Sequence, residues 1–337
     1  PILTCALRSR SNDFTARIWS LGSDPHQLEG TPILLNHAST SEQDLHYVTT
    51  LDWDPSGNYL ATGSFDGHCR IWTLQGDLRY TLQAGKGPVL ALKWGPRGKS
   101  LVGTSADAGV KLWDSLTGEL RAEYLDHQGA VLDVHWITAG MFATCSNDTK
   151  ILIYSSDQSA PLHSLVGHTG GVHAVRSDPT GRYLASASED HTARIWSLAD
   201  GQTQAILTGH SQDVYALEWC PVAKLSDSVP SLLATCSSDH TVRVWDATAA
   251  ACLFVLDRCA EPVLGLSFSP NGQYLATGSL DHSVHVWSTT SGQLVKQYDY
   301  PSSVLGLQWS PTGDYIACCL VDTTTSILDG HMKPVGT

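Results

Sequence analysis

Serine, histidine and aspartate occur together repeatedly in this sequence, and as a single set they could form a hydrolytic triad. His168, Ser186 and Asp190 make up one such set, and His210 and Asp239 belong to another. A nucleophilic site needs one set per active centre, whereas these sets recur at regular intervals. The recurrence predicts a structural device, no catalytic residues and no enzyme.

Metal and cofactor chemistry find no support in the sequence. The 15 histidines and 9 cysteines are not at the spacings of zinc ligands, so we predict no metal site and expect buried reduced thiols. Residues 93–100 (KWGPRGKS) resemble a phosphate-binding loop, but Lys93 stands where that motif has its first glycine. The segment would also join two strands rather than a strand and a helix, so no cofactor is predicted.

The charge of the chain limits its partners. The formal net charge of −13 predicts repulsion of nucleic-acid phosphate and attraction to basic partners, so we expect no direct binding of nucleic acid. No apolar run approaches the ~18 residues of a membrane span, and no membrane association is predicted.

A fixed spacing, an aspartate followed six residues later by a large apolar residue, organises the whole chain. It occurs at Asp13/Trp19, Asp66/Trp72, Asp107/Trp113, Asp148/Tyr154, Asp190/Trp196, Asp239/Trp245, Asp281/Trp287 and Asp322/Leu328. Successive aspartates are 53, 41, 41, 42, 49, 42 and 41 residues apart, a period typical of β-propeller blades. Residues 183–196 (YLASASEDHTARIW) have the pattern of two strands joined by a tight turn. We therefore predict an all-β single domain over residues 1–337, a β-propeller of eight four-stranded antiparallel blades.

The two ends of the chain and two long intervals depart from this regular plan. Residues 7–13 align with residues 60–66, which leaves too few residues before Leu7 for a first strand, so the first blade should be incomplete. The eighth blade should end after its third strand. Polar insertions at 38–44 and 222–231 explain the long intervals and are candidate interaction loops.

A Gly-His pair, followed by a Ser or Thr, an Asp and, six residues after the Asp, a Trp, resembles the WD-repeat family over the whole chain. The resemblance implies that His, Ser or Thr, Asp and Trp form a buried hydrogen-bonded tetrad in each blade. The implied members are His168, Ser186 or Ser188, Asp190 and Trp196 in blade five, and His210, Thr235 or Ser237, Asp239 and Trp245 in blade six. The His position is Gly85, Cys259 and Tyr300 in blades three, seven and eight, while Tyr154 and Leu328 replace Trp. We expect those blades to depend on apolar packing.

The residues in which the repeats differ are the candidates for partner binding. Two sets should share one face of the ring, the residues just before each repeat aspartate and the residues that begin each first strand. The predicted partner-binding face comprises Tyr47, Phe65, Glu189, Asp213, Glu261 and Leu280. An exposed aromatic side chain rimmed by carboxylates would suit an extended, partly basic peptide.

A narrower resemblance concerns residues 49–94 (TTLDWDPSGNYLATGSFDGHCRIWTLQGDLRYTLQAGKGPVLALKW) and 142–154 (FATCSNDTKILIY). Both runs look like repeats of the transducin beta-like corepressor family. That family implies a non-catalytic chromatin scaffold, which joins corepressor and histone deacetylase subunits, binds basic histone tails and recruits ubiquitin machinery in transcription regulation. It also implies that the protein is nuclear, with the cytoplasm as a second location. The family's N-terminal oligomerisation helices have no counterpart in this chain.

A substrate receptor or adaptor of a ubiquitin ligase, or another WD-repeat scaffold, is the alternative. Adaptors for cullin ligases usually carry Trp-Asp-x-Arg at a strand end. Here Trp113-Asp114-Ser115-Leu116 and Trp245-Asp246-Ala247-Thr248 lack the arginine. The sequence therefore favours the corepressor scaffold and leaves the alternative open.

Overall fold

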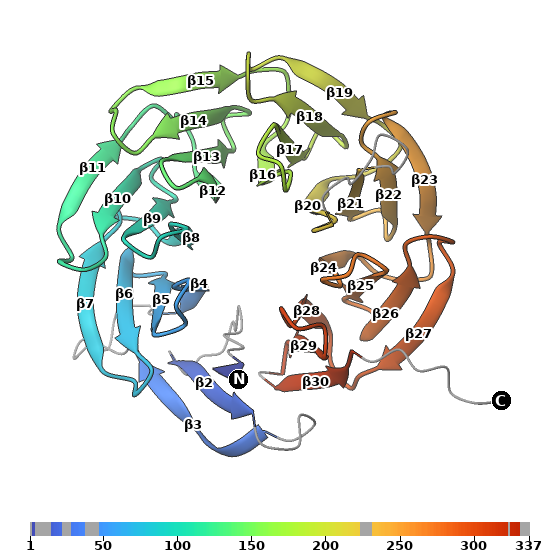
Figure 1. Ribbon diagram of the computed structural model, residues 1–337, viewed down its shortest axis with the longest axis horizontal. Helices are drawn as coiled ribbons and strands as arrows, with labels where there is room; N and C mark the ends of the chain where they lie inside the picture. Colours follow the sequence, from blue (N-terminus) through green and yellow to red (C-terminus); the bar gives the residue numbers. More distant parts are fainter. Residues whose placement is uncertain are drawn as a thin grey trace.

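The computed structural model is a ring of eight antiparallel sheets around a central channel (Figure 1). It describes residues 2–3, 15–21, 28–37, 47–222, 231–322 and 324–330. Every regular element in these ranges is a β-strand, and consecutive strands pair within each sheet. Six blades have four strands, and the first and the eighth have three. The all-β propeller predicted from the sequence is confirmed, as is the incomplete first blade.

The strands fall into four positions from the channel outward. The first, innermost strands are β4 (Val48–Trp53), β8 (Val89–Trp94), β12 (Val131–Thr138), β16 (Val172–Ser177), β20 (Val214–Trp219), β24 (Val263–Phe268) and β28 (Val304–Trp309). The second are β1 (Ile2–Leu3), β5 (Tyr59–Ser64), β9 (Ser100–Ser105), β13 (Met141–Ser146), β17 (Tyr183–Ser188), β21 (Leu232–Ser237), β25 (Tyr274–Ser279) and β29 (Tyr315–Leu320). The third are β2 (Thr15–Leu21), β6 (His68–Thr73), β10 (Val110–Asp114), β14 (Ile151–Ser155), β18 (Ala193–Ser197), β22 (Val242–Asp246), β26 (Ser283–Ser288) and β30 (Thr325–Asp329). The outer strands are β3 (Leu28–Asn36), β7 (Leu78–Gln83), β11 (Leu120–Tyr124), β15 (Pro161–Leu165), β19 (Thr203–Leu207), β23 (Ala251–Leu256) and β27 (Leu294–Asp299).

The first blade differs in register from the sequence alignment. That alignment predicts Leu7 opposite Trp19, in the way that Leu60 lies opposite Trp72 in blade two. In the structure Leu3 lies opposite Trp19, so the strand pairing is offset by four residues. The aspartate of the first repeat and the insertion at 38–44 lie outside the described residues, as does most of the insertion at 222–231.

Pro-x-Gly turns join the first and second strands of five blades. The glycines Gly57, Gly98, Gly181, Gly272 and Gly313 all have positive φ, between 68° and 81°. Glycine adopts this conformation without steric cost, while the preceding proline presets the φ of its own turn position. The local conformational preferences of proline and glycine therefore account for these five turns.

The core lies between neighbouring blades rather than within one. One buried cluster joins Ile71 and Leu82 of blade two to Trp94 and Trp113 of blade three. Repeating such a cluster around the ring buries both faces of most sheets. Seven described cysteines carry free thiols, five of them buried. Cys319 is disulfide-bonded, so the expectation of reduced thiols is wrong at that position.

Candidate functional site: the repeat networks and the loop face

Blade five assembles its tetrad from two strands, a turn and a loop. His168 precedes β16, Ser186 lies in β17, Asp190 in the turn after it, and Trp196 in β18. The Trp196 indole donates to Ser186 Oγ at 2.8 Å. His168 Nε2 lies 2.8 Å from the same Oγ, and its Nδ1 lies 2.7 Å from Asp190 Oδ2. One chain of hydrogen bonds therefore ties the hairpin to the loop before the blade.

The direction of these bonds fixes the histidine tautomer. An indole N–H only donates and a carboxylate only accepts, so Ser186 accepts from Trp196 and donates to His168 Nε2. His168 Nδ1 then carries the proton and donates to Asp190. Burial lowers the pKa of His168 and outweighs the opposing effect of Asp190, so the neutral form that this network needs is favoured. Burial raises the pKa of Asp190, but bonds from Thr192 and His168 outweigh it and lower that pKa to about 2.

Blade six repeats the arrangement with a threonine hydroxyl. The Trp245 indole donates to Thr235 Oγ1 at 2.9 Å, and His210 Nε2 lies 2.9 Å from that oxygen. His210 Nδ1 lies 2.8 Å from Asp239 Oδ2. Burial lowers the pKa of His210. The pKa of Asp239 falls to about 2, because bonds led by the one from Thr241 outweigh its burial.

The structure also separates the two hydroxyls that the sequence left open in each blade. Ser186 and Thr235 belong to the tetrads. Ser188 Oγ donates instead to Gly170 O at 3.1 Å, and Ser237 Oγ to Gln212 O at 3.2 Å. Each of these serines thus ties the end of its second strand to the loop that precedes the first strand of the blade.

Two further networks were not named from the sequence. In blade two, His37 Nε2 lies 2.7 Å from Thr62 Oγ1, which accepts from the Trp72 indole at 2.8 Å. In blade four, His127 lies 2.9 Å from both Asp148 and Thr144, although tyrosine replaces the tryptophan. A histidine about two dozen residues before the repeat aspartate was the available signal.

Blades seven and eight have buried apolar clusters and also keep polar contacts that the sequence did not predict. In blade seven the Trp287 indole still donates to Thr277 Oγ1 at 3.0 Å, and Cys259 Sγ lies 3.7 Å from His285 Nδ1. In blade eight Tyr300 donates to Ser326 Oγ at 3.0 Å. In these two blades polar contacts between other residues thus take the place of the full tetrad.

A repeated backbone bond brings the two predicted sets of binding residues together. In seven blades the N–H of the residue before the repeat aspartate donates to the carbonyl of the residue just before the first strand. The pairs are Phe65 and Tyr47, Ala106 and Pro88, Asn147 and Ala130, Glu189 and Gly171, Ser238 and Asp213, Leu280 and Pro262, and Val321 and Ser303, at 2.8–3.0 Å. We call the surface formed by these fourteen residues the loop face.

The aromatic part of the loop face lies on blade two. Phe65 is 44% exposed, and its ring meets the ring of Tyr47 edge to face at a centroid distance of 6.3 Å. Aromatic rings presented in this way give large contact area at low entropic cost.

The acidic part lies on blades five and six. The Gly171 N–H donates to Glu189 Oε2 at 3.1 Å, and His173 Nε2 lies 3.6 Å from the other carboxylate oxygen. Asp213 lies 3.7 Å from His191. A Cβ at position 171 would come 3.1 Å from the Glu189 carboxyl group, so glycine lets the carboxylate approach the backbone closely. Glu189 is therefore held in place without losing its exposure.

The aromatic and acidic parts lie on opposite sides of the channel, since blade two faces blades five and six across the ring (Figure 1). The prediction that these carboxylates rim the aromatic side chain is therefore wrong. Leu280 is half-buried on blade seven, where its carbonyl accepts from Ser303 Oγ at 2.8 Å. Glu261 is exposed beside it, and its carbonyl accepts from Ser279 Oγ at 3.0 Å.

Charged residues in the channel pair with neighbouring blades. A cavity of about 810 Å³ is lined by Lys93, His135, Arg176 and Glu218, among others. Lys93 Nζ lies 2.6 Å from Asp52 of the preceding blade, and Arg176 pairs with a blade-four aspartate. Glu218 accepts from the backbone N–H of the next blade at position 268. These contacts join the first strands around the ring.

Among the described residues, no group of three or more His, Cys, Asp or Glu side chains could hold a metal ion. The described part of the chain contains no helix with the length and apolar character needed to cross a membrane.

The repeated networks and the ring define a WD-repeat β-propeller, and the chain belongs to the WD domain, G-beta repeat family. That family matches residues 38–73, 76–114, 159–197, 201–246, 250–288 and 292–331. The matches pass over residues 115–158, which include the blade where tyrosine replaces tryptophan.

Comparison with named proteins confirms the resemblance to transducin beta-like proteins. The chain is 38% identical to the mouse F-box-like/WD repeat-containing protein TBL1X over 276 residues, 65% of this chain and 52% of that protein. It is 39% identical to the Arabidopsis thaliana WD40 repeat-containing protein HOS15 over 334 residues, 97% of this chain and 54% of that protein. The chain thus spans about half the length of these relatives. The crystal structure of the C-terminal WD40 domain of Sif2 has the same fold, with a TM-score of 0.82 at 24% identity over 94% of this chain and 90% of that one.

Proposed function

We propose that this chain is a non-catalytic interaction scaffold of a histone deacetylase-containing transcriptional corepressor complex in the nucleus. WD-repeat propellers are typically scaffolds, and the similarity to transducin beta-like proteins supports this particular assembly. The partners would be corepressor and deacetylase subunits and basic histone tails. The observation that carries the proposal is the loop face, where the repeats keep one backbone bond and differ in side chain.

The loop face offers two kinds of contact to such a partner. Phe65, supported by Tyr47, would anchor an apolar side chain. Glu189 and Asp213 would accept charge-assisted hydrogen bonds from lysine or arginine. Because these two parts lie across the ring, the partner must be an extended segment that crosses the channel mouth. The net charge of −13 would steer a basic segment towards the ring and repel nucleic acid.

A pulldown from nuclear extract tests this proposal. The full chain is compared with the double variant Phe65→Ala/Glu189→Lys, which removes the aromatic anchor and reverses one charge. We expect wild type to recover corepressor and deacetylase subunits, and the variant to lose most of them.

The matched control is Leu116→Ala/Asp157→Lys. Both residues are exposed in turns between third and outer strands, on the rim opposite the loop face. This control should recover the same subunits as wild type. Recovery of cullin-ligase components in place of deacetylase subunits would favour the ubiquitin-ligase receptor and overturn the corepressor proposal. Equal losses in both variants would overturn the assignment to the loop face.

A further inference from the structure

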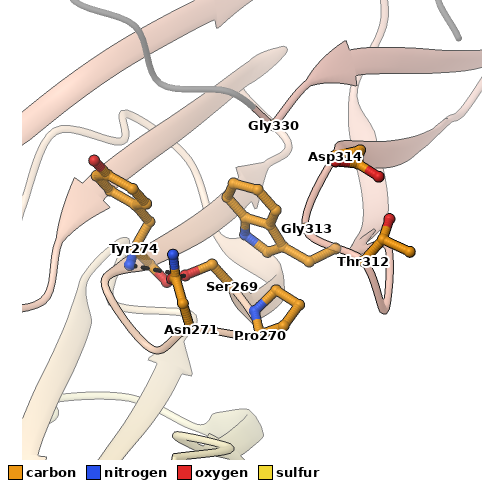
Figure 2. Close-up of a pocket in the computed structure, with 9 residues that line it drawn as sticks. Ser269, Pro270, Asn271, Tyr274, Thr312, Gly313, Asp314 and Gly330 are labelled. Atoms are coloured by element: carbon orange, nitrogen blue, oxygen red, sulfur yellow. Dashed lines mark hydrogen bonds between the residues drawn. The ribbon is translucent and has the colours of Figure 1, made fainter.

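A pocket of about 460 Å³ opens between blades seven and eight (Figure 2). The turns after β24 and β28 form two of its walls, with Pro270 and Asn271 on one side and Thr312 and Asp314 on the other. Tyr274 forms part of the lining as well. First strands begin at the loop face and end at this opposite rim, so the pocket is remote from the proposed binding surface. Its volume is in the range of small-ligand sites.

Trp309, at the end of β28, lines this pocket and differs from three tryptophans at equivalent positions in other blades. Their indoles donate to carbonyls of the preceding blade, from Trp94 to Asp52 at 3.0 Å, from Trp136 to Lys93 at 3.2 Å, and from Trp219 to Arg176 at 3.0 Å. Trp309 is only 5% exposed, and its Nε1 has no hydrogen-bond partner among the described residues. A buried donor left without an acceptor costs free energy that a ligand can restore.

Gly330 shows why the indole differs in blade eight. The equivalent residues of blades three and seven, Ser115 and Thr289, each donate a hydroxyl to a turn carbonyl at 2.7 Å. Gly330 offers no hydroxyl, and a Cβ there would come 2.8 Å from the ring of Trp309. The Trp309 ring thus packs against Gly330 of its own blade, in the space that the side chain of Ser115 or Thr289 occupies in the other blades.

The chemistry of the walls limits what could satisfy the indole N–H. No Lys, Arg or His is among the described residues that line the pocket, so an anionic acceptor would find no opposite charge there. Pro270, Tyr274 and Trp309 provide apolar and aromatic surface, which proline rings prefer.

We propose that this pocket binds a proline-containing peptide segment, whose backbone carbonyl accepts the hydrogen bond from Trp309 Nε1. The site is independent of the proposed corepressor function, because it uses the opposite rim and none of the loop-face residues. It gives the propeller a second place to hold a protein partner.

Nuclear magnetic resonance of the ¹⁵N-labelled full chain tests the site through the indole N–H signals. The probes are acetyl-Ala-Pro-Ala-amide and its matched control acetyl-Ala-Gly-Ala-amide. We expect the proline probe to shift the Trp309 indole signal while those of Trp94, Trp136 and Trp219 stay in place. The glycine probe should bind at least about threefold more weakly.

Two variants separate the indole bond from general effects on the fold. Trp309→Phe removes the donor and keeps an aromatic ring, so affinity for the proline probe should fall about three- to tenfold, the value of one hydrogen bond. Trp219→Phe removes an indole that is already bonded and should leave affinity unchanged. The proposal is overturned if the Trp309 signal does not move at about 10 mM probe, where even weak binding is detectable. Equal binding of the two probes, or unchanged binding by Trp309→Phe, overturns it too. The wild-type titration decides the question even if a variant fails to fold.

Discussion

Blades five and eight hold their repeat aspartates in different ways. Asp190 in blade five is 7% exposed at its side chain and accepts from His168, Thr169 N–H and Thr192. Asp322 in blade eight is exposed, and its described acceptor bonds come from Thr324, two residues along the chain. Both turns form, but only in blade five does the carboxylate accept bonds from outside its own turn, whereas in blade eight the Asp322 N–H donates to Ser302 Oγ at 3.1 Å.

Two contacts account for the difference: the bond from the histidine, which Tyr300 replaces in blade eight, and one backbone N–H. The residue after the histidine position donates its N–H to the repeat aspartate from Lys86, Gln128, Thr169, Ser211 and Ala260 in blades three to seven. In blade eight that residue is Pro301, which has no N–H. A local bond two residues long therefore makes the turn, and a separate long-range bond anchors it.

The largest effect should follow from removing the shared hydroxyl of blade five. Ser186→Ala leaves the Trp196 indole and His168 Nε2 buried without partners, so we expect a loss of about 2–4 kcal/mol in the free energy of unfolding. Cys318→Ala, at the equivalent position of blade eight, should cost about 1 kcal/mol or less. Urea unfolding measures both. Equal losses would contradict the contrast between the blades.

Converting the loop of blade five into that of blade eight should have the next largest effect. Thr169→Pro removes the N–H that Asp190 accepts, and we expect a loss of about 1–2 kcal/mol. The reverse change, Pro301→Thr, should leave stability within about 0.5 kcal/mol, because Asp322 is exposed. Thermal unfolding of the two variants decides whether this backbone bond anchors the turn.

Lowering the pH should weaken blades four, five and six before blade eight. Burial lowers the pKa of His127, His168 and His210 in the folded chain, so the unfolded chain takes up protons first as the pH falls below about 6.5. Stability from these groups is present above that pH and lost as it falls towards 5. Tyr300, whose pKa burial raises, does not titrate in this window.

Glu218 acts in the opposite direction, because burial raises its pKa to about 7 and the folded chain then binds a proton first as the pH falls. Urea unfolding in a Glu218→Gln background, between pH 8 and 5, isolates the histidines. Amide hydrogen exchange should show faster opening of β17 and β18 at pH 5 while β29 changes little. A flat stability profile would sink this prediction.

The smallest effect should come from the phenol of blade eight. Tyr300→Phe removes one hydrogen bond to Ser326 and should cost about 0.5–1.5 kcal/mol. Phe65→Ala, on the loop face, is the control for an aromatic change outside any tetrad. It should leave the free energy of unfolding nearly unchanged while it reduces the recovery of partner subunits. If Tyr300→Phe lowered the free energy of unfolding more than Ser186→Ala, the polar contacts of blade eight would contribute more to stability than those of blade five, contrary to this comparison.

Much of this architecture could be predicted because it rests on short-range chemistry. Repeat spacing, Pro-x-Gly turns and the local aspartate bond are all visible within a few residues. The choice between Ser186 and Ser188 was not, because residues two apart in a strand share a face and only packing distinguishes them. The same limit applies to blade seven, where Cys259 occupies the histidine position. Its contact with His285, a residue of another strand, could not be predicted from the spacing of the repeat. The position of Phe65 across the ring from Glu189 could be seen only in the closed ring of eight blades (Figure 1).

The seven bonds of the loop face have a consequence for how this surface can change over time. Donor and acceptor are both main-chain atoms, so the bond itself does not depend on the side chain at the acceptor positions, and two of them already carry proline. At the donor positions proline alone is barred, since it has no N–H to give. The ring can therefore acquire new recognition chemistry at fourteen places while the geometry of its mouth stays constant. Substitutions at these positions would therefore change partner specificity before they changed the stability of the fold.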